Sequence, residues 1–212
     1  MEDILDVYQR PYDPKHPVVC IDEKSKQVLG TPKGSIPAAP GRPERIDYEY
    51  KRNGTANIFA WVEPLTGRRN ADVTQRRTSV DFAEQLKDLT DVQYPDAEKI
   101  VLVSDNLNTH SPASLYERYE PVEAHRIANK IEWHHTPEHG SWLNIAEIEL
   151  SILSRQCLNR RIADIETLRR EVGAYNLDRN QVTTIIDWQF RTADARIKLR
   201  RLYPKTMNNQ LN

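Results

Sequence analysis

Two short apolar runs, each leading into an aspartate, constrain this chain more than any other feature of its sequence. Residues 17–21 are rich in β-branched side chains and precede Asp22, and residues 100–103 are aliphatic and precede Ser104 and Asp105. Runs of this length and composition are typical of buried strands in a sheet. The chain must therefore build a sheet that other elements cover.

The pattern elsewhere in the chain supplies those other elements. Residues 30–43 contain seven Gly or Pro residues, which excludes a helix or central strand and predicts a long exposed connection. The sequence further predicts a hairpin of 57–62 and 70–74 with its turn at 64–67, a helix capped by Thr78 or Ser79 and running through Leu89, a short helix at 112–116, a strand at 131–135, a helix from near Ser141 and another at 163–178. This order of strands and helices indicates an α/β sheet flanked by helices.

Length and composition set the broad class of protein. The 212 residues suffice for one domain with a sizeable core, and a charged content of 29% is typical of globular proteins. No apolar run approaches the roughly 18–20 residues that span a bilayer, and the acidic start is unlike a signal peptide. Two cysteines, Cys20 and Cys157, are too few for a disulfide framework. We expect a cytoplasmic protein with no membrane partner.

The charge pattern is more informative than the net charge of −1. Basic residues gather in five clusters, at 68–69, 76–77, 160–161, 169–170 and 196–201. One such pair is usually a solvated surface, but five in a near-neutral chain suggest that positive charge is segregated to one face. A segregated basic face is what binding to DNA requires.

The two aspartates suggest a site for divalent cations. Strand ends in an α/β sheet are where ligands gather, although a single Asp after a strand is more often a turn residue. Adjacent carboxylates repel and raise one another's pKa unless a cation lies between them, and an oxygen-only cluster suits magnesium or manganese better than zinc. A third acid is expected from the helix near Ser141, where Glu147 and Glu149 compete. On a helical wheel Glu149 lies among apolar residues and Glu147 lies on the opposite, exposed side. A metal ligand, however, must leave the core face and point toward the strand ends, so helical spacing does not decide between the two glutamates.

At these residues the chain resembles bacterial insertion-sequence transposases of the Tc/mariner superfamily, which carry an Asp-Asp-Glu (DDE) triad. The matching stretches are RPYDP at 10–14, VVCIDE at 18–23, DNLNTH at 105–110, HHTPEHGSWLNIAEIE at 134–149 and WQFRTADARIKLRRLYP at 188–204. They occur in the family's order and cover nearly the whole chain. The family's third acid closes an Asn-x-x-Glu pattern, which falls on Asn144 and Glu147, and Glu149 is kept as the runner-up.

The resemblance implies a fold and a reaction. The expected fold is a ribonuclease H-like mixed sheet flanked by helices, with an N-terminal extension at 1–16, the catalytic domain at 17–180 and a C-terminal helix and tail at 181–212. The expected cofactors are two Mg²⁺ ions, replaceable by Mn²⁺, held by Asp22, Asp105 and Glu147, with Asp22 bridging them. The expected reaction is DNA strand cleavage followed by strand transfer, on the double-stranded DNA of transposon ends and target. By the same resemblance we expect a homo-oligomer associated with the nucleoid.

Several residues near these acids are candidates for contact with DNA. They are Asn106, Asn108, His110, His139, Trp142 and Asn144. The alternative for the two asparagines and His110 is loop capping. Seven Lys and Arg residues between positions 24 and 52 predict a basic loop that either follows a DNA backbone or is simply solvated.

Other functions are weighed against this hypothesis. A zinc site at His134, His135 and His139 is disfavoured, because Pro137 and Gly140 prevent the helical turn that would align the last two. No Gly-x-Ser-x-Gly turn or phosphate-binding loop occurs. Two alternatives stay open: a ribonuclease H-like nuclease that cuts without joining, and a truncated DNA-binding or dimerising fragment that inhibits its full-length relative. The second is raised because transposases of this group carry an N-terminal helix-turn-helix region, and this sequence begins almost at the catalytic domain.

Overall fold

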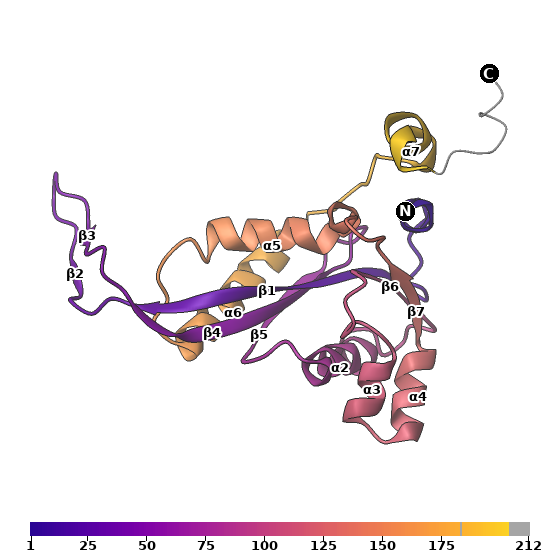
Figure 1. Ribbon diagram of the computed structural model, residues 1–212, viewed down its shortest axis with the longest axis horizontal. Coiled ribbons are helices and arrows are strands. Elements are labelled where there is room, and N and C mark those ends of the chain that lie inside the picture. Colours follow the sequence, from indigo (N-terminus) through magenta and orange to yellow (C-terminus); the bar gives the residue numbers. More distant parts are fainter. Residues whose placement is uncertain (183, 204–212) are drawn as a thin grey trace.

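The computed structural model describes residues 1–182 and 184–203. Its centre is a five-stranded sheet in the order β5-β4-β1-β6-β7 (Figure 1). The strands are β1 (Val18–Gly30), β4 (Lys51–Val62), β5 (Arg69–Thr74), β6 (Ile100–Ser104) and β7 (Ile131–His135). The β1–β4 and β4–β5 pairs are antiparallel, whereas β1–β6 and β6–β7 are parallel. The sheet is therefore mixed, as predicted.

One face of the sheet is covered by helices from the middle of the chain. They are α2 (Ser79–Asp88), continued by a π-helical turn at Leu89–Gln93, α3 (Ala113–Arg118) and α4 (Pro121–Asn129). Their apolar residues pack with alternate residues of the strands, including Ile21 of β1 and Phe59 of β4. The helix α2 begins where the sequence predicted, because Thr78 caps it and the Asp81 side chain returns a bond to the Thr78 backbone. The helix α4 was not predicted.

The opposite face is covered by α5 (Ile145–Gln156) and α6 (Ile165–Gln181). Leu150 and Leu153 of α5 and Leu168 of α6 pack there on Ile58 and Ala60 of β4. The predicted helix near Ser141 begins as a 3-10 turn at Ser141–Leu143, and the α-helix itself starts only after Asn144. Because residues of β1 alternate between faces, Cys20 and Asp22 point to this side and Ile21 to the other.

The strand β1 corrects one prediction. It continues eight residues beyond Asp22 to Gly30, so Asp22 lies within a strand, opposite Ala60, and not at a strand end. Beyond the sheet β1 pairs with β4 alone, and the two form a ribbon that ends in the short strands β2 (Ser35–Ile36) and β3 (Arg45–Ile46) (Figure 1). The predicted basic loop at 24–52 is therefore mostly this ribbon and its tip. Its polar residues did not end the strand because a two-stranded ribbon buries neither face completely.

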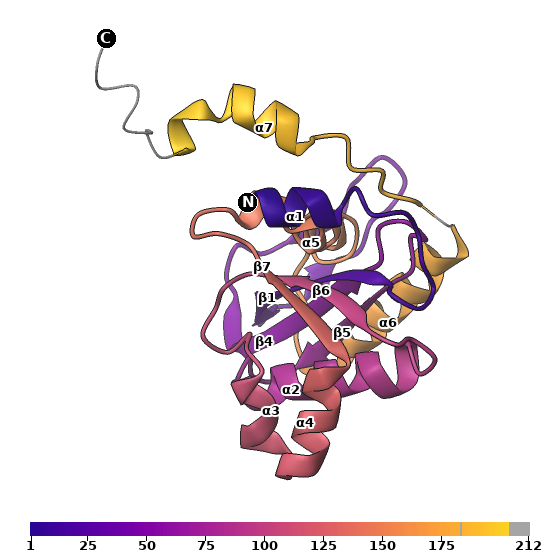
Figure 2. The same cartoon turned by 90° about the vertical axis from the view of Figure 1, so that its right-hand side faces the viewer.

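The two ends of the described chain pack together. The helix α1 (Glu2–Val7), which was not predicted, buries Ile4 and Leu5 in a cluster that includes Ala195 of α7 (Thr192–Lys198). Figure 2 shows α7 lying alongside α1, and Arg196 donates to Glu2 at 2.7 Å. Within the predicted tail segment, Thr183 and residues 204–212, including the last proline of the 188–204 motif, lie outside the described residues. No helix in the described ranges is long and apolar enough to cross a membrane.

Candidate active site

The two aspartates lie on neighbouring segments of the sheet, near the carboxyl end of β6. The parallel strands β1 and β6 pair up to Cys20 and Val103. Two residues further along each chain stand Asp22 and Asp105, the first still in its strand and the second just beyond β6. In a parallel pair, residues equally far past the last paired position lie beside each other. The register therefore brings the two residues close together near the carboxyl end of β6.

The start of α5 is fixed against the same point of β1. Asn144 is fully buried; its Oδ1 accepts from the Ala146 backbone, and its Nδ2 donates to the carbonyl oxygen of Ile21 at 2.8 Å. One side chain thus caps the helix and attaches it to the residue before Asp22. Glu147 follows in the first turn of the helix, half-buried.

The pKa of Asp22 shows that the other acids lie close to it. The pKa of Asp22 is raised to about 7, first by burial and then by the negative charges of Asp105, Glu23 and Glu147. Asp105 behaves differently: burial acts to raise its pKa, but the hydrogen bond and positive charge of His110 outweigh this and lower it. Three segments far apart in the sequence therefore contribute carboxylates to one neighbourhood.

The donor set fits a hard divalent cation, although it is not assembled as a finished metal cage. Within residues 1–182 and 184–203, no three His, Cys, Asp or Glu side chains are already grouped as metal ligands. The Oδ1 atom of Asp22 accepts from the Glu23 backbone at 2.8 Å, and Oδ1 of Asp105 is engaged by His110. The neighbouring carboxylates raise the pKa of Asp22, and a bound Mg²⁺ or Mn²⁺ would relieve that repulsion.

The runner-up acid, Glu149, has other partners. It is 3% exposed, as the helical wheel predicted, and accepts from Arg69 Nη1 at 2.5 Å and from the Tyr175 hydroxyl at 2.7 Å. Arg179 also lies 3.4 Å away. This buried ion pair ties α5 to β5 and α6. No sequence pattern predicted this ion pair, because Arg69 stands in the sequence only as one half of a basic pair.

His110 and Glu23 form a second buried group beside the acids. The Nδ1 atom of His110 contacts Oδ1 of Asp105, and its Nε2 lies 3.0 Å from Oε2 of Glu23. Burial acts to lower the pKa of His110, but the contacts with the carboxylates of Asp105 and Glu23 raise it to about 9. Sequence reasoning missed Glu23. Strand alternation could have found it, since a residue next to Asp22 must face the opposite side of the sheet.

The predicted DNA-contact residues divide into two groups. Asn106, Asn108 and His139 are exposed, and Trp142 is 43% exposed with its ring against Phe190. A cavity of about 350 Å³ brings Asp105, Asn106 and His139 together with neighbouring residues of the same two loops. His110 and Asn144 are instead buried by the contacts above. Their burial disfavours direct contact of these two side chains with DNA.

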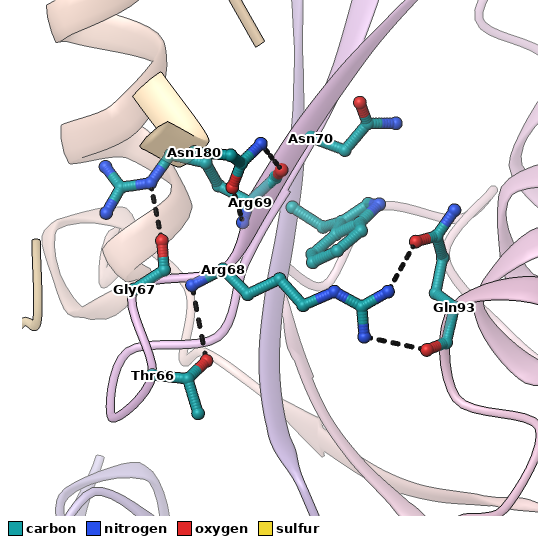
Figure 3. Close-up of a pocket in the computed structure, with 8 residues that line it drawn as sticks. Thr66, Gly67, Arg68, Arg69, Asn70, Gln93 and Asn180 are labelled. Atoms are coloured by element: carbon teal, nitrogen blue, oxygen red, sulfur yellow. Dashed lines mark hydrogen bonds between the residues drawn. The ribbon is translucent and has the colours of Figure 1, made fainter. Parts of the chain in front are cut away.

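A second hollow lies elsewhere. A pocket of about 380 Å³ is lined by residues 66–70, Trp61, Gln93 and Asn180, and none of the three acids is among them (Figure 3). Its Arg68 donates to Gln93 at 2.8 and 3.0 Å and lies over the rings of Trp61 and Tyr94. These contacts attach the β4–β5 turn to the end of α2.

Comparison with known proteins agrees with this geometry. The family described as DDE superfamily endonuclease matches residues 17–169, a span that contains Asp22, Asp105 and Glu147. The chain belongs to the DDE superfamily endonucleases. No curated protein matches this endonuclease chain.

Solved structures extend the comparison to the fold. The DDE endonuclease chain is similar to the Mos1 strand transfer complex, with a TM-score of 0.52 and 13% identity over 83% of this chain and 51% of the other. A Mos1 transposase paired-end complex with the left transposon end is also similar, with a TM-score of 0.37 and 15% identity over 84% and 57%. The first likeness confirms the predicted ribonuclease H-like fold. The chain spans about half the length of the solved protein it matches.

Proposed function

We propose that this DDE superfamily endonuclease is the catalytic domain of a Tc/mariner-type DNA transposase, which cuts DNA strands and joins them to a target. The observation that carries the proposal is the buried Asp22, whose pKa is raised to about 7 in part by Asp105 and Glu147. Repulsion among acids is unfavourable to the fold. It is explained if the same acids serve to hold cations.

We assign the ligand set to Asp22, Asp105 and Glu147. The two aspartates come from neighbouring strands, and Glu147 from a helix that Asn144 attaches to β1. The burial of Glu149 and its ion pair with Arg69 favour Glu147 as the third acid, because Glu149 could leave Arg69 only at the cost of a buried unpaired charge.

The proposed cofactors are two Mg²⁺ ions, for which Mn²⁺ can substitute. Bound there, they would activate the attacking oxygen and stabilise the leaving oxygen on either side of phosphorus. The chain's own contribution is to hold three carboxylates close together, partly shielded from water. The exposed Asn106, Asn108, His139 and Trp142 would contact DNA near the scissile phosphate.

The proposed partners are double-stranded DNA of transposon ends and of a target, and further copies of the chain. The similar Mos1 structure is a strand transfer complex. From that likeness and from the sequence resemblance we infer that the chain binds DNA, forms oligomers and is associated with the bacterial nucleoid. The division into an extension at 1–16, a catalytic domain at 17–180 and a tail at 181–212 belongs to the same proposal.

Nicking of supercoiled DNA by the purified chain tests the assignment. Mn²⁺ or Mg²⁺ should support nicking, and Asp22→Asn, Asp105→Asn and Glu147→Gln should each lower its rate at least 100-fold. Glu98→Gln, which removes an exposed carboxylate that precedes β6, at the opposite end of that strand from Asp105, is the matched control and should leave the rate unchanged. Equal activity of the three variants and the wild type would refute the site.

A second substrate separates transposase from simple nuclease. A duplex with a recessed 3′-hydroxyl at its end should become joined to plasmid DNA in the same buffer. Nicking without joining would favour the nuclease that only cuts. Binding of DNA without nicking in Mg²⁺, Mn²⁺ or any other divalent ion would favour the inhibitory fragment.

A further inference from the structure

A buried histidine links the two segments that carry the aspartates. His110 is 2% exposed and packs against Phe82 of α2 with ring centroids 4.3 Å apart. One ring nitrogen contacts Asp105, five residues earlier in the same loop, and the other lies 3.0 Å from Glu23 of β1. A single imidazole therefore spans from the loop after β6 to the residue next to Asp22.

Glu23 is held in place for this contact. Its side chain is 4% exposed, and its other oxygen, Oε1, lies 3.5 Å from the guanidinium of Arg77. Asp22 and Glu23 are consecutive in a strand, so their side chains point to opposite faces of the sheet. Glu23 thus points to the face covered by α2, where His110 packs, while Asp22 points to the face covered by α5.

The contacts on Asp105 are one-sided. Its Oδ1 accepts from the ring of His110 and, at 3.3 Å, from the Leu107 backbone. No described residue donates a hydrogen bond to Oδ2. A carboxylate on a loop after a strand can otherwise rotate freely, and repulsion from Asp22 would favour rotation away from the site.

We propose that His110 is a positioning residue, which holds Asp105 through Oδ1 and leaves Oδ2 free to bind the divalent cation, with Glu23 fixing the ring. The proposal rests on the proposed function, since it assigns His110 a role toward the ligand Asp105. Groups that orient a metal ligand through a hydrogen bond typically change metal affinity 10- to 100-fold when they are removed.

Two amide substitutions test the two contacts of the His110 ring separately, because each keeps one contact and removes the other. The side-chain nitrogen of Asn occupies nearly the position of Nδ1, so His110→Asn keeps a donor for Asp105 and loses the one for Glu23. The nitrogen of Gln reaches nearly to Nε2, so His110→Gln keeps the donor for Glu23 and loses the one for Asp105. His110→Ala removes both, and His125→Gln, an exposed histidine on α4, is the matched control.

Mn²⁺ affinity of the purified variants, measured by electron paramagnetic resonance, should follow the contact with Asp105. We expect His110→Ala and His110→Gln to weaken Mn²⁺ binding 10- to 100-fold and to lower kcat for nicking, with the KM for DNA unchanged. His110→Asn should recover most of both losses. Thermal unfolding without metal measures the purely structural effect, and a ranking of Mn²⁺ affinity that merely follows stability would overturn the proposal.

Crystal structures of the metal-free variants provide a readout that does not depend on activity. Asp105 should keep its orientation in His110→Asn and rotate in His110→Gln and His110→Ala. An unchanged Asp105 in His110→Ala would overturn the positioning role even if the wild type is active. A wild type that neither binds Mn²⁺ nor nicks DNA would overturn the proposed function, while the orientation of Asp105 would still decide the role of His110.

Discussion

The ionised side chain of Asp22 destabilises the fold that contains it. It is 8% exposed and lies near three other carboxylates, so its ionised form is unfavourable in the metal-free protein. Its pKa is about 7 in the folded state, against an ordinary value near 4 in the unfolded chain. A raised acid pKa means that the folded state binds the proton more tightly. The resulting stabilisation is complete below about pH 4 and is lost as the pH rises to about 7.

Substitution of Asp22 by Asn should remove this pH dependence. We expect Asp22→Asn to match the wild type at pH 4 and to exceed its free energy of unfolding at pH 8 by roughly 2–4 kcal/mol. Urea unfolding of both metal-free proteins at pH 4, 6 and 8 measures the difference. The same difference in free energy of unfolding at all three pH values would show that the pKa of Asp22 is not raised in the folded protein.

The two glutamates of α5 should separate activity from stability. Glu149→Gln removes the charge that neutralises the buried Arg69, which should lower the free energy of unfolding by about 3–5 kcal/mol. Glu147→Gln changes a half-buried acid without an ion pair among the described residues, so stability should change by about 0.5 kcal/mol or less while nicking is lost. Thermal unfolding and nicking assays on both variants test the contrast. The reverse pattern would make Glu149 the third acid.

Among the elements, α6 protects one edge of the sheet, the strand β5. Asn176 donates to the carbonyl of Ala71 at 2.7 Å and accepts from its amide at 3.0 Å, and Asn180 forms the same pair of bonds with Arg69. These amide side chains, one helical turn apart, bond to alternate residues of β5 as a neighbouring strand would. An edge strand that is satisfied in this way cannot pair with another chain.

Loss of one of these side chains should uncover the edge. Asn176→Ala leaves the amide and carbonyl of Ala71 without partners, which should cost about 1–3 kcal/mol and promote aggregation through β5. Asn159→Ala, an exposed asparagine in the α5–α6 connection, is the control. Urea unfolding and light scattering at 37 °C compare the two. If both variants stay as stable and as soluble as the wild type, α6 does not serve as an edge cover.

At the scale of the whole molecule, cation binding should stabilise the protein that carboxylate repulsion weakens. A ligand at 100 times its Kd contributes about 2.7 kcal/mol, which corresponds to a Tm increase of roughly 5–10 °C for a chain of this size. Mn²⁺ should therefore raise the Tm at pH 8, and raise it less at pH 5, where protons compete for Asp22. Asp105→Asn should abolish most of the increase. Differential scanning fluorimetry provides the measurement, and an equal increase in that variant would place the cation elsewhere.

Sequence patterns alone predicted most of the strands and helices, and the motifs identified the family. The apolar runs at β1 and β6, the hairpin of β4 and β5 and the cap at Thr78 were predicted because their signals are local, lying within a few residues of the structure they specify. Local signals misplaced the end of β1, since polar residues on a ribbon beyond the sheet look like a loop. They also missed α1, whose burial depends on contacts with α7 at the other end of the chain.

Which of the candidate site residues contact one another became clear only from the folded chain. Helical spacing left Glu147 and Glu149 equal, and only the positions of Arg69 and Tyr175, far along the chain, gave Glu149 its buried partners. In the same way His110 changed from a candidate DNA contact to a bridge between Asp105 and Glu23. The physical reason is that charge interactions and burial depend on distance in space, and segments far apart in sequence acquire that distance only when the chain folds.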